Sequence, residues 1–355
     1  MAKISLCMIV KDEEEVLGRC LNQVKGLVDE IIILDTGSQD STREIACRYA
    51  DRVEDFVWQK DFAAARNASF ALAKGDYCMW LDADDVITSK EQEKFLKARE
   101  TLSLDIDMVF MDYAVSFDEN GDPDLIYPRE RLIRNGKGFL WKGRVHEAIK
   151  PSGKTIHLPV VIEHRKVKSG DPDRNLRIYE KMLEEKEFFD ARAHFYYGRE
   201  LAGHCRWEEA LRELELTAAD KEAWVENRIS ACLDGASCAV ALGQQEKALA
   251  LLFQSFAWAP PRAEICCEAG RIFIDQQRYD QAAYWYERAL DAKDSACSGA
   301  FYYKRYHGYI PWIQLCVCYY KMGRYDKAYQ CHLRAKELWP EAKEVKANEA
   351  FFGTK

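Results

Sequence analysis

Four aspartates follow two apolar segments at the positions where buried strands would end. Asp35 comes directly after one apolar run, and Asp82, Asp84 and Asp85 come directly after another at residues 76–81. In an open α/β sheet, ligands bind at the carboxyl ends of the strands, so these side chains would meet there. Two carboxylates one residue apart can hold Mg²⁺ or Mn²⁺, which neutralises the charge of a diphosphate. An isolated Asp-x-Asp is more often a turn former, so the pair needs support from the rest of the chain.

The turn after the first apolar segment excludes other nucleotide-binding classes. It reads Lys11-Asp12-Glu13-Glu14, whereas a dinucleotide-binding fold needs Gly-x-Gly-x-x-Gly so that backbone amides can approach the pyrophosphate. The chain also contains no Walker loop. A sugar nucleotidyltransferase uses metal-binding acids too, but it normally opens with a Gly-rich basic phosphate loop, which this turn is not. Dehydrogenase, P-loop and nucleotidyltransferase chemistry are therefore disfavoured.

Strand and helix patterns alternate over roughly the first 115 residues, which predicts βαβ units and a mainly parallel sheet. The expected strands cover residues 4–10, 30–34, 52–57, 76–81 and about 108–115. Four helices are expected. The first ends near residue 24, the second ends at residue 50, the third covers residues 62–73 and the fourth begins at about residue 89. Gly and Pro then punctuate residues 120–170, which predicts short β-rich runs, such as residues 138–141 and 155–163, in an irregular appendage beside the sheet. Asp171, as N-cap, and Pro172 are expected to open a helix.

The remainder of the chain is predicted to be helical and to repeat. Ala210, Ala248, Ala282 and Ala328 occupy equivalent positions at successive offsets of 38, 34 and 46 residues, and the middle offset equals the tetratricopeptide unit. Small residues recur twelve positions before them, at Gly198, Ala236, Gly270 and Cys316, and seven positions after them, at Thr217, Ser255, Ala289 and Ala335. We expect about four units over residues 190–345, with an inserted loop at 294–307. The many aromatic side chains there either pack between helices or line a ligand groove.

Composition and charge narrow the class of protein further. The 355 residues are 48% hydrophobic with a net charge of −8, so the chain can bury sizeable cores but lacks the cationic surface of a general nucleic-acid binder. No apolar run approaches the roughly 18 residues of a membrane span, and the run at 4–10 is short for a secretory signal. The 13 cysteines include no Cys-x-x-Cys pair, which predicts reduced thiols. We expect a cytoplasmic protein without a membrane span.

Four segments of the N-terminal half carry a family resemblance. They are SLCMIVKDEE at 5–14, DEIIILDTGSQDST at 29–42, DFAAARN at 61–67 and GDYCMWLDADD at 75–85. Together they resemble the nucleotide-sugar half of family 2 glycosyltransferases with the GT-A fold, strongly over residues 3–115 and weakly over 116–170. With a tetratricopeptide tail, the chain is similar to bacterial protein or peptide glycosyltransferases, including sublancin-type S-glycosyltransferases and flagellin-modifying enzymes. The resemblance implies an α/β GT-A domain, Rossmann-like, at 1–170 and an all-α tetratricopeptide-like solenoid at 171–355.

The resemblance also implies a UDP-sugar donor, a divalent cation (Mn²⁺ or Mg²⁺) and inversion at the anomeric carbon. It makes Asp84 the direct metal ligand and places Asp82 at the metal or the ribose. Asp35 or Thr36 then contacts the uracil or ribose, because the family often has Asp-Asp-Gly-Ser where this chain has Asp-Thr-Gly-Ser. The further residues that the resemblance assigns to the nucleotide are Val10, Asp12, Arg66 and Asn67.

The sequence points less directly to the catalytic base than to the metal and nucleotide residues. Many relatives use a Glu-Asp pair after the acceptor loop, and residues 130–170 contain none. The segment GRVHE is similar to a Val-His-Glu of peptide-modifying relatives, so Glu147 is expected to be the base and His146 to orient it or approach the metal. His164 either completes the metal shell or is a buried, hydrogen-bonded histidine. Three arginines of this region either clamp the diphosphate or are solvated: Arg129, Arg131 and Arg134.

The leading hypothesis is a metal-dependent inverting glycosyltransferase. Its donor would be UDP-glucose or UDP-N-acetylglucosamine, and its acceptor a Ser, Thr or Cys side chain of a peptide or protein. The repeats would recognise that polypeptide, or would pair two copies as a homodimer. Two alternatives stay open: an acceptor that is a glycan or is lipid-linked, and a catalytically inactive tetratricopeptide scaffold or regulator. Release of UDP from UDP-sugars with Mn²⁺ separates the active from the inactive protein.

Overall fold

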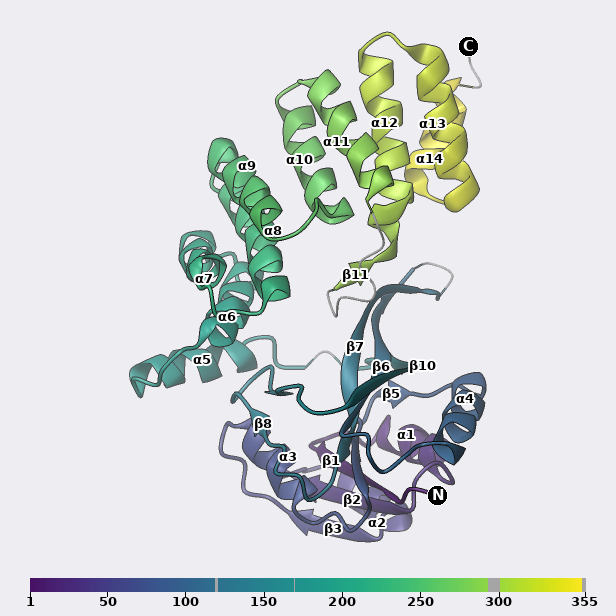
Figure 1. Ribbon diagram of the computed structural model, residues 1–355, viewed down its shortest axis with the longest axis vertical. Helices are drawn as coiled ribbons and strands as arrows, with labels where there is room; N and C mark the ends of the chain where they lie inside the picture. The colour runs from purple at the N-terminus through teal and green to yellow at the C-terminus, as the bar shows by residue number, and fades with distance from the viewer. Residues whose placement is uncertain (119–120, 169, 293–300, 353–355) are drawn as a thin grey trace. The chain divides into compact units, whose positions relative to one another are not determined.

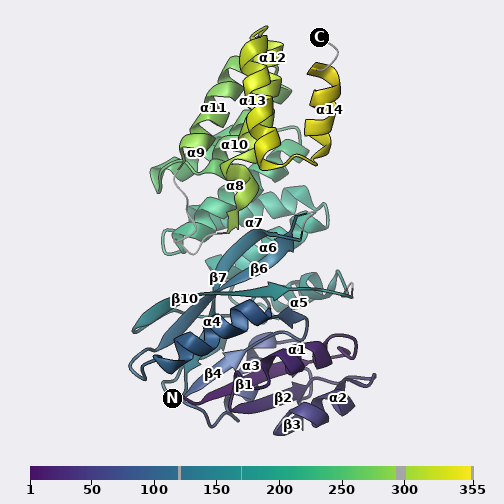
Figure 2. The ribbon, with the colours of Figure 1, turned by 90° about the vertical axis from the view of Figure 1, so that its right-hand side faces the viewer.

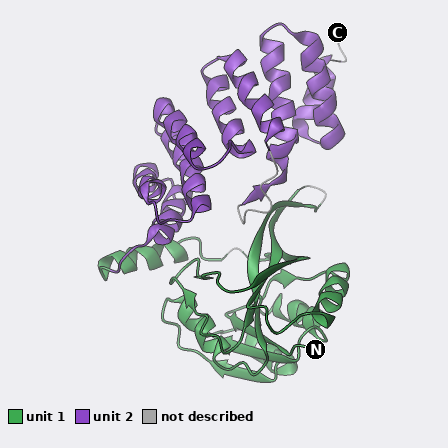
Figure 3. Cartoon of the chain, in the orientation of Figure 1, with its two compact units in different colours: residues 1–186 green, residues 187–355 purple. Residues whose placement is uncertain are grey.

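The chain consists of two compact units, Met1–Lys186 and Glu187–Lys355 (Figure 3). The computed structural model describes residues 1–118, 121–168, 170–292 and 301–352. In the described residues no helix combines the length and apolarity that crossing a membrane requires, and each cysteine there is a free thiol.

The division between the units differs by one helix from the expected boundary at residue 170. Helix α5 (Arg174–Glu184) groups with the first unit. It follows Asp173 rather than Asp171, so the expected N-cap at Asp171 is wrong. Asp171 instead forms a turn before the helix, where its carboxylate accepts a hydrogen bond from the N–H of Asp173 at 3.1 Å.

Strands and helices alternate over roughly the first 115 residues, as expected, and within the described part of residues 108–164 the strands then follow one another without a helix between them (Figure 1). The strands are β1 (Ile4–Val10), β2 (Glu30–Asp35), β3 (Arg52–Asp55), β4 (Tyr77–Trp80), β5 (Asp85–Val86), β6 (Met108–Phe117), β7 (Pro123–Arg134), β8 (Trp141–Lys142), β9 (Ala148–Ile149) and β10 (Thr155–His164). The helices before α5 are α1 (Leu17–Val24), α2 (Thr42–Tyr49), α3 (Phe62–Phe70) and α4 (Ser89–Glu100).

One curled, mixed sheet runs through this unit in the order β3-β2-β1-β4-β7-β6-β10-β5 (Figures 1 and 2). The pairs β1–β2, β1–β4, β2–β3 and β6–β10 are parallel, whereas β4–β7, β6–β7 and β5–β10 are antiparallel. Because β2 and β4 flank β1 in parallel, the carboxyl ends of these three strands lie at one edge. That edge is where Asp35 and Asp82 leave the sheet.

Strand β1 is buried on both faces, which explains its continuous apolar sequence. Leu6 and Met8 join the larger core, which also contains the apolar stripe of α1. Cys7 points to the opposite face, where it packs with Ile32 and Cys78 beside α3. The stripe of α1 has the spacing of one helix face and consists of Leu17, Cys20, Leu21 and Val24.

The segment expected to be an irregular appendage instead supplies two long strands of the main sheet. Strand β7 lies between β4 and β6, and β10 pairs with β6. The sequence hides β7 because Arg129, Glu130 and Arg131 stand in its middle and read as a solvated loop. Arg131 is 0% exposed and Glu130 5%, since each is paired with an opposite charge. The run expected at residues 155–163 is confirmed as β10, whereas the run expected at 138–141 reaches only the first residue of β8, which forms a separate two-stranded ribbon with β9.

The second unit is built from successive helix pairs. They are α6 (Ala191–Gly203) with α7 (Trp207–Ala219), α8 (Val225–Ala241) with α9 (Gln245–Gln254), α10 (Ala263–Asp275) with α11 (Tyr279–Asp291), and α12 (Tyr309–Lys321) with α13 (Tyr325–Leu338). Shorter elements follow α9, α11 and α13: η1 (Ser255–Ala257), β11 (Tyr302–Tyr303), η3 (Lys304–His307) and α14 (Lys343–Phe352). Residues 293–300, which include the first half of the expected inserted loop, lie outside the described residues.

The small residues of the repeat pattern lie where the paired helices touch. In each pair the first helix contributes the earlier small residue and the second contributes the alanine, and all of them are buried. A Cβ on Gly198 would lie 2.8 Å from the Leu214 side chain, and one on Gly270 would lie 2.8 Å from the Tyr286 ring. The tetratricopeptide-like arrangement is therefore confirmed by the close approach of the helices. The aromatic side chains are mixed: Tyr286 is buried in the helical core, whereas Tyr284 is 53% exposed.

Candidate active site

A buried ion pair holds the turn that follows β4. Asp85 is 1% exposed, and its Oδ2 accepts hydrogen bonds from the N–H of Asp82 and from Nη1 of Arg131, both at 3.0 Å. The Arg131 guanidinium lies 3.8 Å from the ring centroid of Trp80 and 4.3 Å from that of Tyr113. Removing either partner would leave an uncompensated buried charge. The pair therefore fixes the direction in which Asp82 leaves the strand.

Asp82 itself faces a second arginine. Its side chain is 34% exposed, and its Oδ1 accepts a hydrogen bond from Nη2 of Arg66 at 2.8 Å. Burial raises the pKa of Asp82, but the positive charges of Arg66, Arg131 and His164 outweigh it and lower the pKa to about 2. Asp82 is therefore a carboxylate at neutral pH.

Arg66 joins this carboxylate to Glu147. It lies on α3, a helix capped by Asp61, whose Oδ1 accepts the N–H of Ala64 at 2.9 Å. Its guanidinium lies 4.6 Å from the Trp80 ring centroid, and its Nε donates to Oε1 of Glu147 at 2.6 Å. Arg66 is 7% exposed and Glu147 9%. A single buried cation thus links the end of β4 to the loop after β8.

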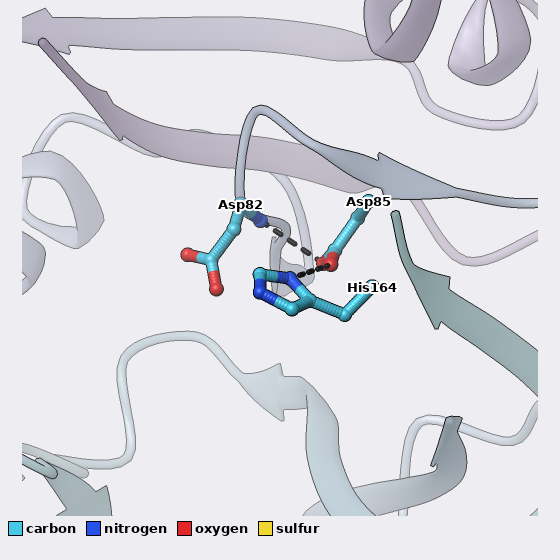
Figure 4. Close-up of side chains that lie close together, drawn as sticks. All are labelled: Asp82, Asp85 and His164. Carbon is cyan, nitrogen blue, oxygen red and sulfur yellow. Dashed lines mark hydrogen bonds and ion pairs between the residues drawn. The ribbon is translucent and has the colours of Figure 1, made fainter. Parts of the chain in front are cut away.

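His164, the last residue of β10, brings a nitrogen to the same acids (Figure 4). Its Nδ1 lies 3.2 Å from Oδ1 of Asp84, 3.6 Å from Oδ1 of Asp85 and 3.0 Å from the Tyr113 hydroxyl. Burial lowers the pKa of His164, but its hydrogen bonds with Asp84 and Asp85 raise it to about 10. The imidazole is therefore cationic, and it holds positive charge next to the aspartates.

The arrangement can hold a divalent cation. Ligand atoms of Asp82, Asp85 and His164 lie within 4.8 Å of one another. Both oxygens of Asp85 already accept hydrogen bonds, so Asp82 and Asp84 are better placed to offer oxygens. Carboxylate oxygens are the ligands that hard divalent cations prefer, and an imidazole nitrogen is a further possible ligand.

The local charge also favours a cation. Burial and then the negative charges of Asp84, Asp82 and Asp40 raise the pKa of Glu13 to about 7, although Lys168 opposes them. Burial is the larger cause of this shift, and the neighbouring aspartates add negative charge to it. A bound dication would offset that negative charge.

Glu147 and His146 lie on the tight loop 143–147, between β8 and β9. Gly143 has a φ of +98° and His146 a φ of +51°, both in the left-handed region. A Cβ on Gly143 would lie 3.3 Å from the carbonyl oxygen of Val145, so glycine suits this position. The His146 ring stacks on Tyr179 of α5, with centroids 6.5 Å apart and 17° between the planes. His146 therefore faces α5 while Glu147 faces Arg66.

The residues expected at the nucleoside gather where β1 and β2 end. The carbonyl oxygen of Val10 accepts hydrogen bonds from the N–H of Thr36 at 2.9 Å and from its Oγ1 at 3.1 Å. Asp35 is 4% exposed, and its Oδ1 accepts two backbone N–H groups of the following turn at 3.0 and 2.8 Å. Asp12, with a φ of +54°, donates its N–H to Oγ of Ser38 at 3.0 Å. These bonds shape the two loops at this edge.

Asn67 and the arginines of β7 have partners that the sequence does not reveal. Asn67 uses both ends of its amide on the backbone of Trp141, at 3.0 and 2.9 Å, and so ties α3 to β8. Arg131, expected to clamp a diphosphate or to be solvated, does neither because it is fully buried. Arg129 pairs with Glu130 at 3.1 Å, and Arg134 donates to the carbonyl of Asp76 at 3.0 Å.

Sequence reasoning missed the residues that support the acids from behind. Arg19 of α1 donates from Nη2 to the carbonyl oxygen of Asp84 at 3.1 Å, and Tyr113 of β6 donates to Oδ1 of Asp85 at 2.9 Å. Arg131 is the third such residue. An arginine in a polar run carries no local signal of burial. Tyr113 does sit at an apolar position of its strand, which was the one usable signal.

Comparisons with known proteins agree with this geometry. Residues 5–152 match the family model of glycosyl transferase family 2. This part of the chain is a family 2 glycosyltransferase domain. Over 154 residues the chain is 40% identical to a TPR repeat-containing protein of Synechococcus elongatus, an alignment that covers 43% of this chain and 36% of that protein. Over 226 residues it is 29% identical to the SPbeta prophage-derived glycosyltransferase SunS of Bacillus subtilis, which covers 60% of this chain and 52% of that one.

The relatives are thus matched over only part of their length, about a third of the first and half of the second. Among solved structures, the tetratricopeptide protein TTC0263 of Thermus thermophilus is 20% identical, with a TM-score of 0.38, covering 50% of this chain and 89% of that one. At that score, the assignment of the second unit rests on its own helix pairs. The chain therefore combines a family 2 glycosyltransferase domain with tetratricopeptide-like helix pairs.

Proposed function

We propose that the chain is a metal-dependent, inverting glycosyltransferase that moves a sugar from a UDP-sugar to a Ser, Thr or Cys side chain of a peptide or protein. UDP-glucose and UDP-N-acetylglucosamine are the proposed donors. The observation that carries the proposal is the convergence of Asp82, Asp85 and His164 at the carboxyl end of β4, with Asp84 3.2 Å from Nδ1 of His164. That edge is where an open α/β sheet binds its ligands.

We assign Asp82, Asp84 and His164 to a bound Mn²⁺ or Mg²⁺ ion. When bound, such an ion supplies positive charge to a diphosphate leaving group. The low pKa of Asp82 keeps its carboxylate ionised at neutral pH, so it needs no deprotonation to act as a ligand. His164 must give up its extra proton before it can bind metal, because only the neutral imidazole is a ligand.

The donor nucleotide is proposed to lie along the ends of β1 and β2. Asp35 and Thr36 would contact the uracil or ribose, with Val10 and Asp12 shaping the loop beneath them. Arg66 would approach the phosphate side, because its guanidinium adjoins Asp82. The amide of Asn67 supports this region through its two bonds to the backbone of β8.

Glu147 is proposed to take the acceptor's proton. The acceptor oxygen or sulfur attacks the anomeric carbon, UDP leaves from the opposite face, and the proton of the attacking group passes to the carboxylate. Arg66 engages Oε1 of Glu147, and within the described residues no hydrogen bond involves Oε2, so that oxygen is available for the proton.

The second unit is proposed to recognise the polypeptide acceptor. Stacked helix pairs form an extended surface without reactive groups of their own, which suits recognition rather than chemistry. Pairing of two copies through these helices is the alternative role.

The first prediction tests the metal site. Asp84→Asn should fold normally, because the amide keeps the size of the side chain and an oxygen to face His164. UDP release from UDP-glucose with Mn²⁺ should nevertheless fall by about 10²-fold, since a neutral amide binds a hard cation weakly. Asp55→Asn is the matched control, because Asp55 ends the neighbouring strand β3 and pairs with Arg43 at the surface. Near-normal turnover of Asp84→Asn at saturating Mn²⁺ would contradict the assignment. A wild-type chain that binds UDP-sugars but releases no UDP would be a scaffold or regulator.

A further inference from the structure

Loop 143–147 holds a conformation that its own sequence does not favour. His146 is a non-glycine residue with a φ of +51°, three positions after Gly143 with a φ of +98°. Left-handed backbone is uncommon for residues other than glycine, although histidine adopts it more readily than most, so contacts around the loop contribute to holding it.

Helix α5 contacts the loop at two points. The His146 ring stacks on Tyr179, a residue 2% exposed, with 6.5 Å between the centroids. Nη2 of Arg144 lies 2.8 Å from a carboxylate oxygen of Glu185, the residue directly after α5. On the other side, the carbonyl of Arg144 accepts the N–H of Phe62 at the start of α3, at 2.9 Å. The loop is thus held between α3 and the far end of the first unit.

These contacts restrict the position of Glu147. Arg144 and His146, the two residues anchored on α5, immediately precede it in the loop. Glu147 itself reaches Arg66 at 2.6 Å. A shift of the loop would therefore change the distance between Glu147 and Arg66 first, and the contact of Arg66 with Asp82 at the end of β4 only after that.

We infer that α5 is a positioning element of the catalytic unit: Tyr179 and Glu185 hold loop 143–147 so that Glu147 points to Arg66 and the acidic edge. Residues 171–186 then serve the chemistry of the first unit rather than the helical repeats. The effect on turnover rests on the proposed function of Glu147. The positioning of the loop does not rest on it.

The test uses the full chain and exchanges the surface ion pair. Glu185→Arg and Arg144→Glu each place like charges together, and the double variant restores an opposite pair. We expect the backbone amides of residues 143–147 to exchange with deuterium about 2- to 5-fold faster in each single variant and at the wild-type rate in the double variant. Arg177→Gln is the matched control, because it removes an ion pair on the exposed side of the same helix, with Asp171. In Arg177→Gln, the backbone amides of residues 143–147 should exchange at the wild-type rate.

Steady-state UDP release from UDP-glucose with Mn²⁺ gives the second readout. The single variants should lower kcat by about 10-fold with little change in KM, and the double variant should recover, because only the reacting geometry is disturbed. Tyr179→Leu should behave like the single variants if it folds. Unchanged loop exchange in both single variants overturns the inference, as does faster exchange with unaltered kcat. Faster, rescuable exchange in a chain whose wild type releases no UDP supports the positioning of the loop and rejects the proposed function.

Discussion

Two buried arginines near β4 differ in the exposure of the acidic side chains with which they pair. Arg131 pairs with Asp85, and both side chains are 0% exposed, so this pair shapes the turn from inside. Arg66 pairs with Asp82 and Glu147, whose side chains are 34% and 10% exposed. The second arginine therefore lies between the interior and the acidic edge, where it holds Asp82 and Glu147 in place.

The second prediction concerns the proposed base. Glu147→Gln keeps the shape of the side chain and an oxygen for Arg66, but it cannot accept a proton. UDP and Mn²⁺ should bind with nearly wild-type affinity in isothermal titration, while sugar transfer falls by about 10²- to 10⁴-fold. Glu100→Gln, at the exposed end of α4, should change neither quantity. Loss of UDP binding along with the rate would place Glu147 in the donor or metal site instead.

At the scale of elements, strand β7 gives a prediction about pH. Burial raises the pKa of Glu130, but the adjacent Arg129 outweighs it and lowers the pKa below the ordinary value of 4.5. Because the folded-state pKa is the lower one, the pair stabilises the fold above about pH 4.5, and that contribution is lost as the pH falls through the folded-state value. In urea unfolding at pH 6 and pH 3.5, Glu130→Gln should therefore show a smaller acid-induced loss of stability than the wild type.

At pH 6, Glu130→Gln should also lower the free energy of unfolding by about 1–3 kcal/mol, because it leaves Arg129 without its buried partner. Glu54→Gln, in an exposed pair with Arg52, is the matched control and should keep the wild-type pH dependence. An equal pH dependence in Glu130→Gln and the wild type would mean that other carboxylates carry the acid sensitivity.

The fourth prediction concerns the contact between paired helices. A Cβ on Gly270 of α10 would lie 2.8–3.0 Å from the Tyr286 ring of α11, which is buried and cannot move freely. Gly270→Ala should lower the free energy of unfolding by about 1–3 kcal/mol. Gly203→Ala, at the end of α6 with no atom within 4 Å of the added carbon, should be neutral or slightly stabilising. Equal effects of the two changes would argue against a tight contact at Gly270.

These elements also show what the sequence can and cannot predict. Strand β1 and the small residues of the helix pairs were predictable, because their patterns are local and periodic. Strand β7 was not, because its buried charges are satisfied by partners far along the chain, such as Asp85 for Arg131, 46 residues away. In the site, Asp82 and Asp84 were singled out by their place at the end of a strand together with the family resemblance, and their metal binding stays a prediction. The contact of α5 with loop 143–147 could not, since a stacked ring leaves no sequence signature.

At the scale of the whole molecule, the two units should be separable in function. A fragment of residues 1–186 should bind UDP and slowly hydrolyse UDP-glucose, because it retains the acidic edge, the loop and α5. It should modify a polypeptide acceptor poorly, since it lacks the helix pairs. A fragment of residues 1–170 should still bind UDP but lose hydrolysis, because it lacks Tyr179 and Glu185. Isothermal titration measures the binding of UDP by each fragment, and UDP release measures its hydrolysis of UDP-glucose.

Full transfer to the polypeptide by the 1–186 fragment would assign the helix pairs to stability or to pairing of two copies. Sedimentation of the full chain and of the fragment then separates these two roles.

The strand order has a consequence for how the protein is made on the ribosome. Asp82, Asp84 and Asp85 are synthesised well before β7, yet β7 supplies the arginine that neutralises Asp85 and occupies the open edge of β4. His164 emerges later still, on β10. A nascent chain that stops short of β7 therefore carries an unmatched buried acid and an unpaired strand edge, the features that attract chaperones and promote aggregation. Slow translation between β4 and β7 would lengthen that exposure, so the synthesis rate of this stretch bears on the yield of folded protein.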